Sequence, residues 1–239
     1  MKSRIENELD DIFTRFSEEE GFENTLLRYK IREVLPHVVG PRVLDIGCGV
    51  GLLCRVLAER FERVVGLDGS PVKIARAQQL GGSSNISYFC ELFEKWSPPH
   101  LFETIITTNV LEHVADALAF LKRNRELVVP AGRLIVTVPN ALGLHKRIGF
   151  QMGLIKDFYE LTEADHAKGH RRVYDRRQLE ADIVAAGFKL LHSGGILLKP
   201  LSHSQMNTWD EAVVDALYEV GKELPDYCSS LMVVAVKGD

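Results

Sequence analysis

Cysteine is scarce in this sequence, and the few positions it occupies exclude two familiar uses. The 239 residues contain four cysteines, at positions 48, 54, 90 and 228, with no C-x-x-C pair and no zinc-binding spacing. A reduced, cytoplasmic setting is therefore expected. Apolar runs of membrane-spanning length are also missing. The N-terminus is charged and lacks an apolar segment, so no secretory signal peptide is expected.

Neither sign of charge dominates the composition. The formal net charge is −4, so there is no basic excess to attract nucleic acid or acidic lipid, and we expect neither nucleic acid nor membrane as a partner. The apolar share of 46% and the charged share of 26% are ordinary for a globular protein. A chain of 239 residues suffices for one large α/β domain.

What the sequence does contain is a glycine-rich turn after a buried strand. Gly47, Gly49 and Gly51 stand at alternate positions directly after Val43–Ile46, and a helical pattern begins at Leu52. Glycine lets the backbone approach a ligand, and a helix N-terminus directs its unpaired N–H groups to the same place. A dinucleotide site of the Gly-x-Gly-x-x-Gly type would need glycine at position 52, which argues against a nicotinamide cofactor.

Strand and helix patterns alternate from residue 42 onward. The expected strands are Val43–Ile46, Val64–Leu67, Ile86–Phe89, Thr104–Thr107, Arg133–Val138, Lys189–Ser193 and Leu231–Val236. The expected helices are Leu52–Arg60, Pro71–Gln79, Val114–Leu127, Arg177–Ala186 and Trp209–Gly221. Continuous apolar strands separated by helices predict an α/β, Rossmann-like fold, in which a seven-stranded, mostly parallel sheet has helices on both faces.

The N-terminal segment, residues 1–36, lies outside this alternation. It contains one helical pattern over 1–20 and a second that starts at Phe22 and runs to Val38. We expect both helices to pack over the main domain as a structural lid. The alternative is that one or more of their side chains cover a ligand, with three candidates: Phe16, Arg28 and Tyr29.

Residues 140–175 also fall outside the repeat. They are too many for a plain connection after the fifth strand, so we expect them to form a helical cap. The expected organisation is a single domain over 1–239, with its core in 37–139 and 176–239 and with 140–175 as a cap over the ligand-binding edge of the sheet.

An acidic residue ends the second expected strand. Asp68 follows Val64–Leu67, which a parallel sheet places beside the glycine turn, and its carboxylate can accept both hydroxyl groups of a ribose. The alternative is a helix N-cap, a role for which Ser70 is an equal candidate because it directly precedes Pro71. Asp68 lies further from the helix than a cap requires, so ribose binding is our interpretation.

Together these motifs resemble the class I S-adenosylmethionine-dependent methyltransferases, in particular the branch that includes the ubiquinone-biosynthesis O-methyltransferases. The segments that carry the resemblance are Val43–Gly51, Val65–Ser70 and Thr108–Val114. The resemblance covers residues 37–139 well and continues loosely through Gly169–Tyr174 and Ala185–Phe188. It implies S-adenosyl-L-methionine as the cofactor and S-adenosyl-L-homocysteine as its product.

The resemblance also implies which residues bind the cofactor. They are Asp45, Gly47, Cys48, Gly49, Asp68, Gly69, Leu92, Phe93, Asn109 and Val110. Gly47 and Gly49 would approach the methionine part, with Asp45 organising the loop, and Asp68 would hold the ribose. The branch often has an aspartate at the position of Leu92, so backbone contacts and the aromatic ring that follows are expected to replace a side-chain bond to the adenine.

The implied cofactor determines what the protein must add. A sulfonium methyl group is already electrophilic, so the protein has to hold a nucleophile in line, and good orientation supplies ~7–11 kcal/mol. A hydroxyl acceptor also needs a base. His113, after the fourth strand, is the candidate, because histidine ordinarily titrates near neutral pH. The alternative, that His113 bonds backbone groups at a helix start, stays open, and Glu112 would either orient it or favour the helix N-terminus.

The expected cap is rich in polar side chains that could bind the methyl acceptor. The candidates for acceptor binding are His145, Tyr159, His166, His170 and Tyr174. Arginines of the same segment, 147, 171 and 172, favour an acceptor with an anionic group, because guanidinium binds carboxylate and phosphate well. Lys199 and His203, after the sixth strand, are further candidates.

The favoured function is methyl transfer to a hydroxyl oxygen of a small molecule, by a monomer or homodimer that uses no metal. Transfer to nitrogen of a small amine or sugar is an alternative, although enzymes that methylate base amino groups usually carry Asn/Asp-Pro-Pro-Tyr where this chain has Asn109 to Glu112. A nicotinamide oxidoreductase and a non-catalytic binding module are alternatives from other classes.

A metal-assisted RNA-terminal 2′-O-methyltransferase is a further alternative. One such family uses a comparable Glu-His pair, and here Glu112, His113 and a cap histidine could bind a divalent cation. Asn109 replaces a glutamate of that family, and the net charge of −4 disfavours an RNA substrate.

Overall fold

The centre of the structure, a computed structural model that describes residues 21–238, is a seven-stranded sheet. Its strand order is β3-β2-β1-β4-β5-β7-β6. The strands are β1 (Arg42–Ile46), β2 (Arg63–Asp68), β3 (Ile86–Cys90), β4 (Phe102–Thr108), β5 (Val128–Pro139), β6 (Phe188–Ile196) and β7 (Ser230–Lys237). Only β7 runs antiparallel to its neighbours, so the predicted mostly parallel sheet is confirmed.

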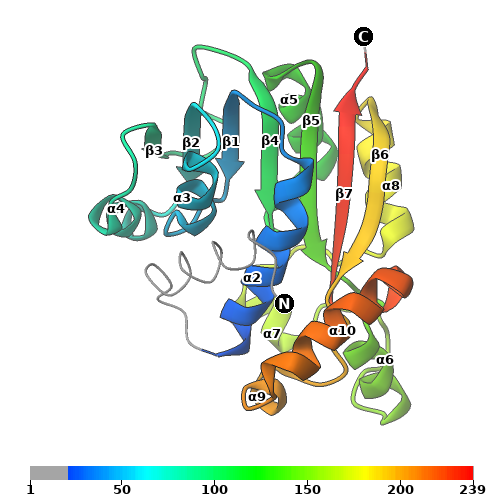
Figure 1. Ribbon diagram of the computed structural model, residues 1–239. Helices are drawn as coiled ribbons and strands as arrows, with labels where there is room; N and C mark the ends of the chain where they lie inside the picture. The colour runs from blue at the N-terminus through cyan, green and yellow to red at the C-terminus, as the bar shows by residue number, and fades with distance from the viewer. Residues whose placement is uncertain (1–20, 239) are drawn as a thin grey trace.

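Helices cover both faces of this sheet (Figure 1). One face carries α2 (Phe22–Val34), α3 (Leu52–Ala58), α4 (Pro71–Leu80) and α10 (Glu211–Glu223). The other carries α5 (Ala117–Leu127) and α8 (Arg176–Ala185). Shorter elements are η1 (Leu35–His37), α6 (Leu144–Gln151), α7 (Glu163–Ala167), α9 (His203–Met206) and η2 (Pro225–Tyr227).

Successive residues of a central strand enter different cores. In β5, Ile135 packs in the core beneath α2, α3 and α10, whereas Leu134 and Val136 pack in the core beneath α5 and α8. In β4, Ile106 and Ile105 divide in the same way. Because both faces are covered, both sets of residues must be apolar, which is why the middle of each of these two strands is continuously apolar.

Two predicted helix starts were wrong by a few residues, and side-chain caps explain both differences. α5 begins at Ala117 instead of Val114, because the Asp116 carboxylate accepts a hydrogen bond from the Ala119 N–H at 2.9 Å. α10 begins at Glu211 because the carboxylate of the preceding residue accepts from an N–H of the first turn at 2.8 Å. Aspartate at an N-cap satisfies N–H groups that have no partner within the helix.

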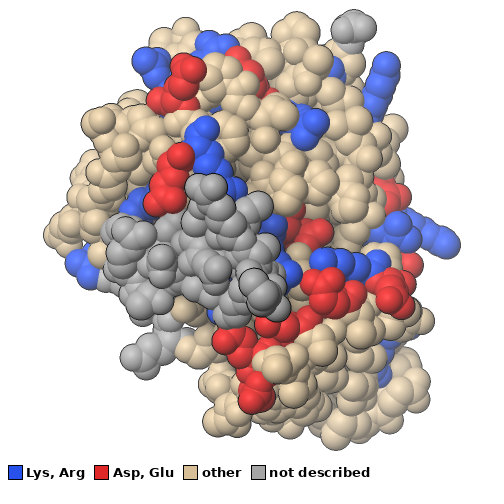
Figure 2. Space-filling model, viewed as in Figure 1, with Lys and Arg blue, Asp and Glu red and all other residues tan. Residues whose placement is uncertain are grey.

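The lid helix α2 ends at Val34, four residues earlier than predicted, and the following 3-10 turn contains a proline. Side chains of α2 face α10: the Tyr29 hydroxyl donates to Asp215 at 2.5 Å, and Arg28 pairs with Glu211 at 2.7 Å. Figure 2 shows basic and acidic side chains next to one another where these helices meet. These contacts agree with the structural role predicted for α2. The helix predicted over 1–20, with Phe16, lies outside the described residues.

The segment 140–175 contains α6 and α7, as predicted for a helical cap. Its end is fastened to the loop between β4 and α5 by Arg172. This guanidinium donates to the carbonyl oxygens of Leu111, Val114 and Ala115 at 2.9, 2.6 and 2.9 Å. The cap is therefore held over the carboxyl ends of the central strands.

The order of strands reverses between β1 and β4. The chain proceeds from β1 outward to β2 and β3, and then returns to place β4 on the other side of β1. In parallel sheets, ligands bind beyond the carboxyl ends of the strands at such a reversal. The glycine turn follows β1 and Asn109 follows β4, so the topology brings the two motifs to the same crevice.

Within residues 21–238, no helix combines the length and the apolar character needed to cross a membrane.

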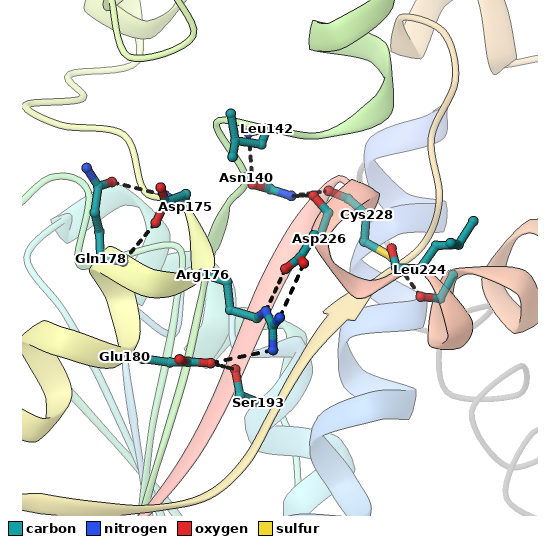
Figure 3. Close-up of polar contacts among 11 residues, drawn as sticks. Asn140, Leu142, Asp175, Arg176, Gln178, Glu180, Ser193, Leu224, Asp226 and Cys228 are labelled. Carbon is teal, nitrogen blue, oxygen red and sulfur yellow. Dashed lines mark hydrogen bonds and ion pairs between the residues drawn. The ribbon is translucent and has the colours of Figure 1, made fainter.

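Asn140 joins the end of β5 to the turn that precedes β7 (Figure 3). Its amide nitrogen donates to the carbonyl oxygens of Asp226 and Cys228 at 3.0 and 2.8 Å, and its Oδ1 accepts from the Leu142 N–H at 2.9 Å. The residue is only 2% exposed. In the same view, Arg176 of α8 pairs with the side chain of Asp226 at 2.6 Å.

We expect Asn140→Ala to lower the free energy of unfolding by about 2–4 kcal/mol, because it removes three hydrogen bonds and leaves buried backbone groups without partners. Asp226→Ala is the matched control: it removes the half-exposed pair with Arg176 but keeps the backbone acceptor, and should cost less than about 1 kcal/mol. Urea denaturation measures both values. Equal losses in the two variants would contradict the role assigned to Asn140.

Candidate functional site

The glycine turn after β1 is packed so closely that its first and third glycines have no room for a side chain. Gly47 has φ +75°, and a Cβ atom there would lie 2.4 Å from Cγ2 of Val110. Gly51 has φ +78°, and a Cβ atom would lie 2.3 Å from the hydroxyl oxygen of Tyr88. The Gly47 N–H donates to the Leu67 carbonyl at 2.7 Å, which ties the turn to β2. Glycine is thus required by both conformation and space.

The middle glycine is different, because no described side chain crowds it. Gly49 has φ +56°, but a Cβ atom built on it would meet no atom of the described residues within 4 Å. Its N–H donates to Oδ2 of Asp68 at 2.9 Å, and Oδ1 of Asp68 accepts from the Ser70 N–H at 2.8 Å. Ser70, not Asp68, caps α4 by accepting from the Lys73 N–H. Asp68 is therefore held at the rim of an open backbone cradle, which fits a ligand with hydroxyl groups.

Asp45, at the centre of β1, is nearly fully buried behind this loop, with 2% exposure. The Cys54 thiol donates to its Oδ2 at 3.4 Å. Burial raises the pKa of Asp45 to about 7. The hydrogen bond from Cys54 lowers this pKa, and the negative charge of Asp68 raises it further. Cys48, which the resemblance also places at the cofactor, is buried too. Its thiol lies 3.8 Å from the Gly49 carbonyl oxygen.

The residues expected beside the adenine point in different directions. Leu92 is 54% exposed, and its Cδ2 would lie 3.0 Å from a Cβ atom on Gly69, so these two residues adjoin each other beyond β2. Phe93 instead turns into the core, where its ring packs edge-on against Phe120 at a centroid distance of 4.9 Å. The Phe93 ring is thus occupied by core packing, which leaves its backbone for any ligand contact.

Asn109 ends β4 in a left-handed conformation, with φ +54°. Asparagine tolerates this conformation better than most residues, and such positions often mark functional sites. The Lys30 ammonium group, from α2, donates to Oδ1 of Asn109 at 2.7 Å, although Lys30 is only 5% exposed. The lid therefore places a buried cation beside the end of β4.

Glu112, His113 and His170 form a compact cluster next to Asn109. One candidate ligand atom from each lies within 4.8 Å of the others. The Glu112 side chain is buried, and neither of its oxygens has a hydrogen-bond partner among the described residues. Burial raises the pKa of Glu112, which the charges of Lys30 and Arg172 oppose.

Hydrogen bonds orient both histidine rings of this cluster. Nδ1 of His113 donates to the Gly169 carbonyl at 3.2 Å, and Nδ1 of His170 donates to Oδ1 of Asp165 at 2.9 Å. The two rings are 4.8 Å apart and nearly perpendicular. Burial lowers the pKa of His170, and Asp165 partly offsets this effect. With both Nδ1 atoms engaged, each ring can present Nε2 to a proton or to a cation.

The structure brings only some of the predicted acceptor-binding residues together. His170 joins the cluster, and His145, at the start of α6, carries a buried Nδ1 without a partner among the described residues. Tyr159 is 41% exposed and bonds Asp175, and His166 lies exposed on α7. Tyr174 is buried, but its hydroxyl donates to Asp182 in the core beneath α8 at 2.9 Å.

Sequence reasoning missed one residue of the site, Lys30. Its neighbours Phe22, Tyr29, Ile31 and Val34 are also buried, so Lys30 lies on the inward side of an otherwise apolar helix face. The sequence did contain a sign of this role: a lysine on the apolar face of a predicted helix. Lysine is rarely buried without a charged or polar partner, so such a position indicates a polar site beneath the helix.

Comparisons with known proteins agree with this architecture. A family model described as a methyltransferase domain matches residues 1–193. A ubiquinone biosynthesis O-methyltransferase of Bradyrhizobium diazoefficiens is 40% identical over 103 residues, which are 42% of this chain and 41% of that protein. The match thus spans about two fifths of the length of that relative. A protein of the same name from Chelativorans is 32% identical over 193 residues, 78% of this chain and 72% of that protein.

Among solved structures, an S-adenosylmethionine-dependent methyltransferase from Mesorhizobium loti superposes with a TM-score of 0.65 at 21% identity, covering 89% of this chain and 98% of that one. This likeness supports the fold. The family model covers most of the chain, and the Chelativorans relative aligns over more than two thirds of its own length. This chain therefore belongs to the class I S-adenosylmethionine-dependent methyltransferases.

Proposed function

We propose that this methyltransferase transfers a methyl group to a hydroxyl oxygen of a small-molecule acceptor. The observation that carries the proposal is the cluster of Glu112, His113 and His170, which lies beside the glycine turn where the strand order reverses. A hydroxyl acceptor must lose a proton, and a histidine with a fixed ring and an available Nε2 suits that task. The O-methyltransferase names of the curated relatives support oxygen over nitrogen.

The chain's own residues fit the cofactor of the family. The open cradle at Gly49 gives the methionine part access to the backbone, and the Asp68 carboxylate at its rim suits the ribose hydroxyls. Leu92 and Gly69 would border the adenine, and Asn109 with Val110 would close the other side. When bound, S-adenosylmethionine would supply an electrophilic methyl group, and in-line attack by the acceptor oxygen would form the O–C bond as the C–S bond breaks and S-adenosylhomocysteine leaves.

The protein's contribution is to orient the acceptor and to take its proton. Arg172 holds the cap over the strand ends, so the cap can position the acceptor and exclude water. The Gly169 carbonyl fixes the Nδ1–H tautomer of His113, which leaves Nε2 as the proton acceptor. Asp165 orients His170 beside it in the same manner.

Asp68→Ala should weaken S-adenosylmethionine binding about 10- to 100-fold, because hydrogen bonds to a charged group are each worth ~1.5–3 kcal/mol. Isothermal titration calorimetry measures the affinity. Glu126→Ala, which removes an exposed carboxylate on α5, is the matched control and should bind normally. Unchanged affinity in the Asp68 variant would remove the ribose assignment.

His113→Ala should lower turnover by about 10²–10⁴-fold, the usual contribution of a general base, while cofactor affinity stays within about twofold of that of the wild type. The measurement is S-adenosylhomocysteine release across a panel of small acceptors with hydroxyl groups. His192→Ala removes an imidazole that stacks on His37 and serves as the control. Normal turnover in the His113 variant would show that another group takes the proton.

A second candidate is metal-assisted transfer, favoured by the two buried Glu112 oxygens, which have no hydrogen-bond partner in the described part of the chain. A divalent cation held by Glu112, His113 and His170 would bind the acceptor oxygen and lower the pKa of its hydroxyl. The net charge of −4 disfavours RNA as that acceptor. In this case, EDTA treatment should abolish turnover and added Mg²⁺ or Mn²⁺ should restore it. Turnover unaffected by EDTA would leave His113 as the base without a metal.

A further inference from the structure

A buried lysine that follows β6 has no polar partner for its ammonium group among residues 21–238. Lys199 is 6% exposed, and among the described residues no hydrogen bond or ion pair reaches its Nζ atom. Its backbone is firmly placed, because its carbonyl oxygen accepts from the N–H of His145 at 3.0 Å. The lysine is thus fixed against the first turn of α6, in the cap.

The surroundings of Lys199 are cationic. The charges of Lys30, Lys146 and Lys168 lower its pKa, after burial as the larger cause, and together these effects bring it to about 8. The carboxylate that acts on it, Glu23, is already engaged, because it pairs with Lys168 at 3.3 Å and lies 3.5 Å from Nδ1 of His203. The carboxylate that acts on Lys146, Asp165, accepts hydrogen bonds from Thr162 and His170. Two engaged carboxylates leave the four lysines with an excess of positive charge.

Two histidines and a second lysine complete the group. The Nδ1 atom of His145 is buried and has no partner among the described residues. Burial, reinforced by the charge of Lys199, lowers the pKa of His145 to about 3 and that of His203 to about 4. Both rings are therefore neutral at pH 7. Lys146, on α6 next to His145, is half-buried and likewise has no hydrogen bond or ion pair from a described residue.

Of the three arginines that the sequence suggested for anion binding, Arg147 and Arg172 are engaged elsewhere and Arg171 is exposed. Arg172 donates to three backbone carbonyl groups, as described above. Arg147 donates to the Leu142 carbonyl at 2.8 Å and lies over the Tyr227 ring at 4.7 Å. Among the buried and half-buried side chains, those left to meet an anion are the lysines and the histidine around Lys199.

The cationic group around Lys199 lies at the same edge of the sheet as the methyl-transfer site. β5 and β6 are both antiparallel to β7, so β6 ends at the same edge of the sheet as β1 and β4. Lys30 links the two regions, because its ammonium group bonds Asn109 and its charge acts on Lys199. The cationic group therefore lies on the cap side of the methyl-transfer site.

We propose that Lys199, Lys146 and His145 form a subsite for one anionic group, a carboxylate or a phosphate, of the methyl acceptor. The proposal rests on the proposed function, and it specifies the acceptor as a hydroxyl compound that carries a negative charge. Burying an unpaired cation is unfavourable, and a bound anion would offset that cost with charge-assisted hydrogen bonds.

The test uses the full-length protein and two probes, inorganic phosphate and benzoate, with binding measured by calorimetry. Lys199→Met keeps the length of the side chain and removes its charge, and it should weaken probe binding at least about tenfold. Lys189→Met, which removes an exposed ammonium group on β6, is the matched control and should bind as the wild type does. Binding of phosphate alone or of benzoate alone would support the subsite and identify the anion.

Thermal unfolding separates this role from a structural one. Without an anion, Lys199→Met should raise Tm by about 2–4 °C, because an unpaired buried charge is replaced by an apolar chain. A lower Tm, or probe binding as tight as in the wild type, would overturn the subsite. So would wild-type protein that binds neither probe.

Methyl transfer is scored separately, so the two proposals can fail independently. Equal turnover of an anionic acceptor and its neutral ester by Lys199→Met and by wild type would refute the subsite and leave the proposed function intact. Anion binding that depends on Lys199, without methylation of any hydroxyl acceptor, would refute hydroxyl transfer and support the subsite.

Discussion

The reversal of strand order between β1 and β4 is the constraint on which the rest of this structure depends. Parallel strands end at one edge, so the reversal brings the glycine turn after β1 and Asn109 after β4 to a single crevice. The two can be neighbours only because Gly47 lacks a Cβ atom, which would otherwise lie 2.4 Å from Val110. The lid and the cap then approach this crevice from two directions, with Lys30 and His170 as their respective contributions.

Buried polar groups are concentrated at this edge of the sheet. Four ionisable residues there are each at most 6% exposed: Lys30, Asp45, Glu112 and Lys199. Burying each of these groups costs free energy that an apolar residue at the same position would not cost. A fold does not need four such groups for its stability. Their shared location indicates that the edge is arranged for binding and chemistry, at some expense to the free energy of folding.

The cap shows why residue type alone is a poor guide to a ligand. The sequence predicts Arg172 as an anion-binding residue, yet its guanidinium group holds the cap by donating hydrogen bonds to carbonyl oxygens. Tyr174 is predicted at the acceptor, yet its ring packs in the core and its hydroxyl donates to Asp182 of α8. A long polar side chain can bond other parts of the protein or bind a ligand, and its neighbours in the structure show which of the two it does. No described residue pairs with the ammonium group of Lys199, and for this reason we infer an anionic acceptor.

The strands, the glycine turn and the acidic residue that ends β2 could be predicted from the sequence, because each depends on local spacing: apolar runs indicate burial on two faces, and glycine indicates backbone with no room for a side chain. The start of α5 was predicted at Val114 instead of Ala117, because periodicity alone does not locate the N-cap at Asp116. Which polar residues meet depends on the tertiary structure. Lys30 and Asn109 are 79 positions apart, and the ring of His113 is oriented by a carbonyl 56 positions away. Such pairs depend on how the lid and the cap pack over the sheet, and no local periodicity encodes that packing.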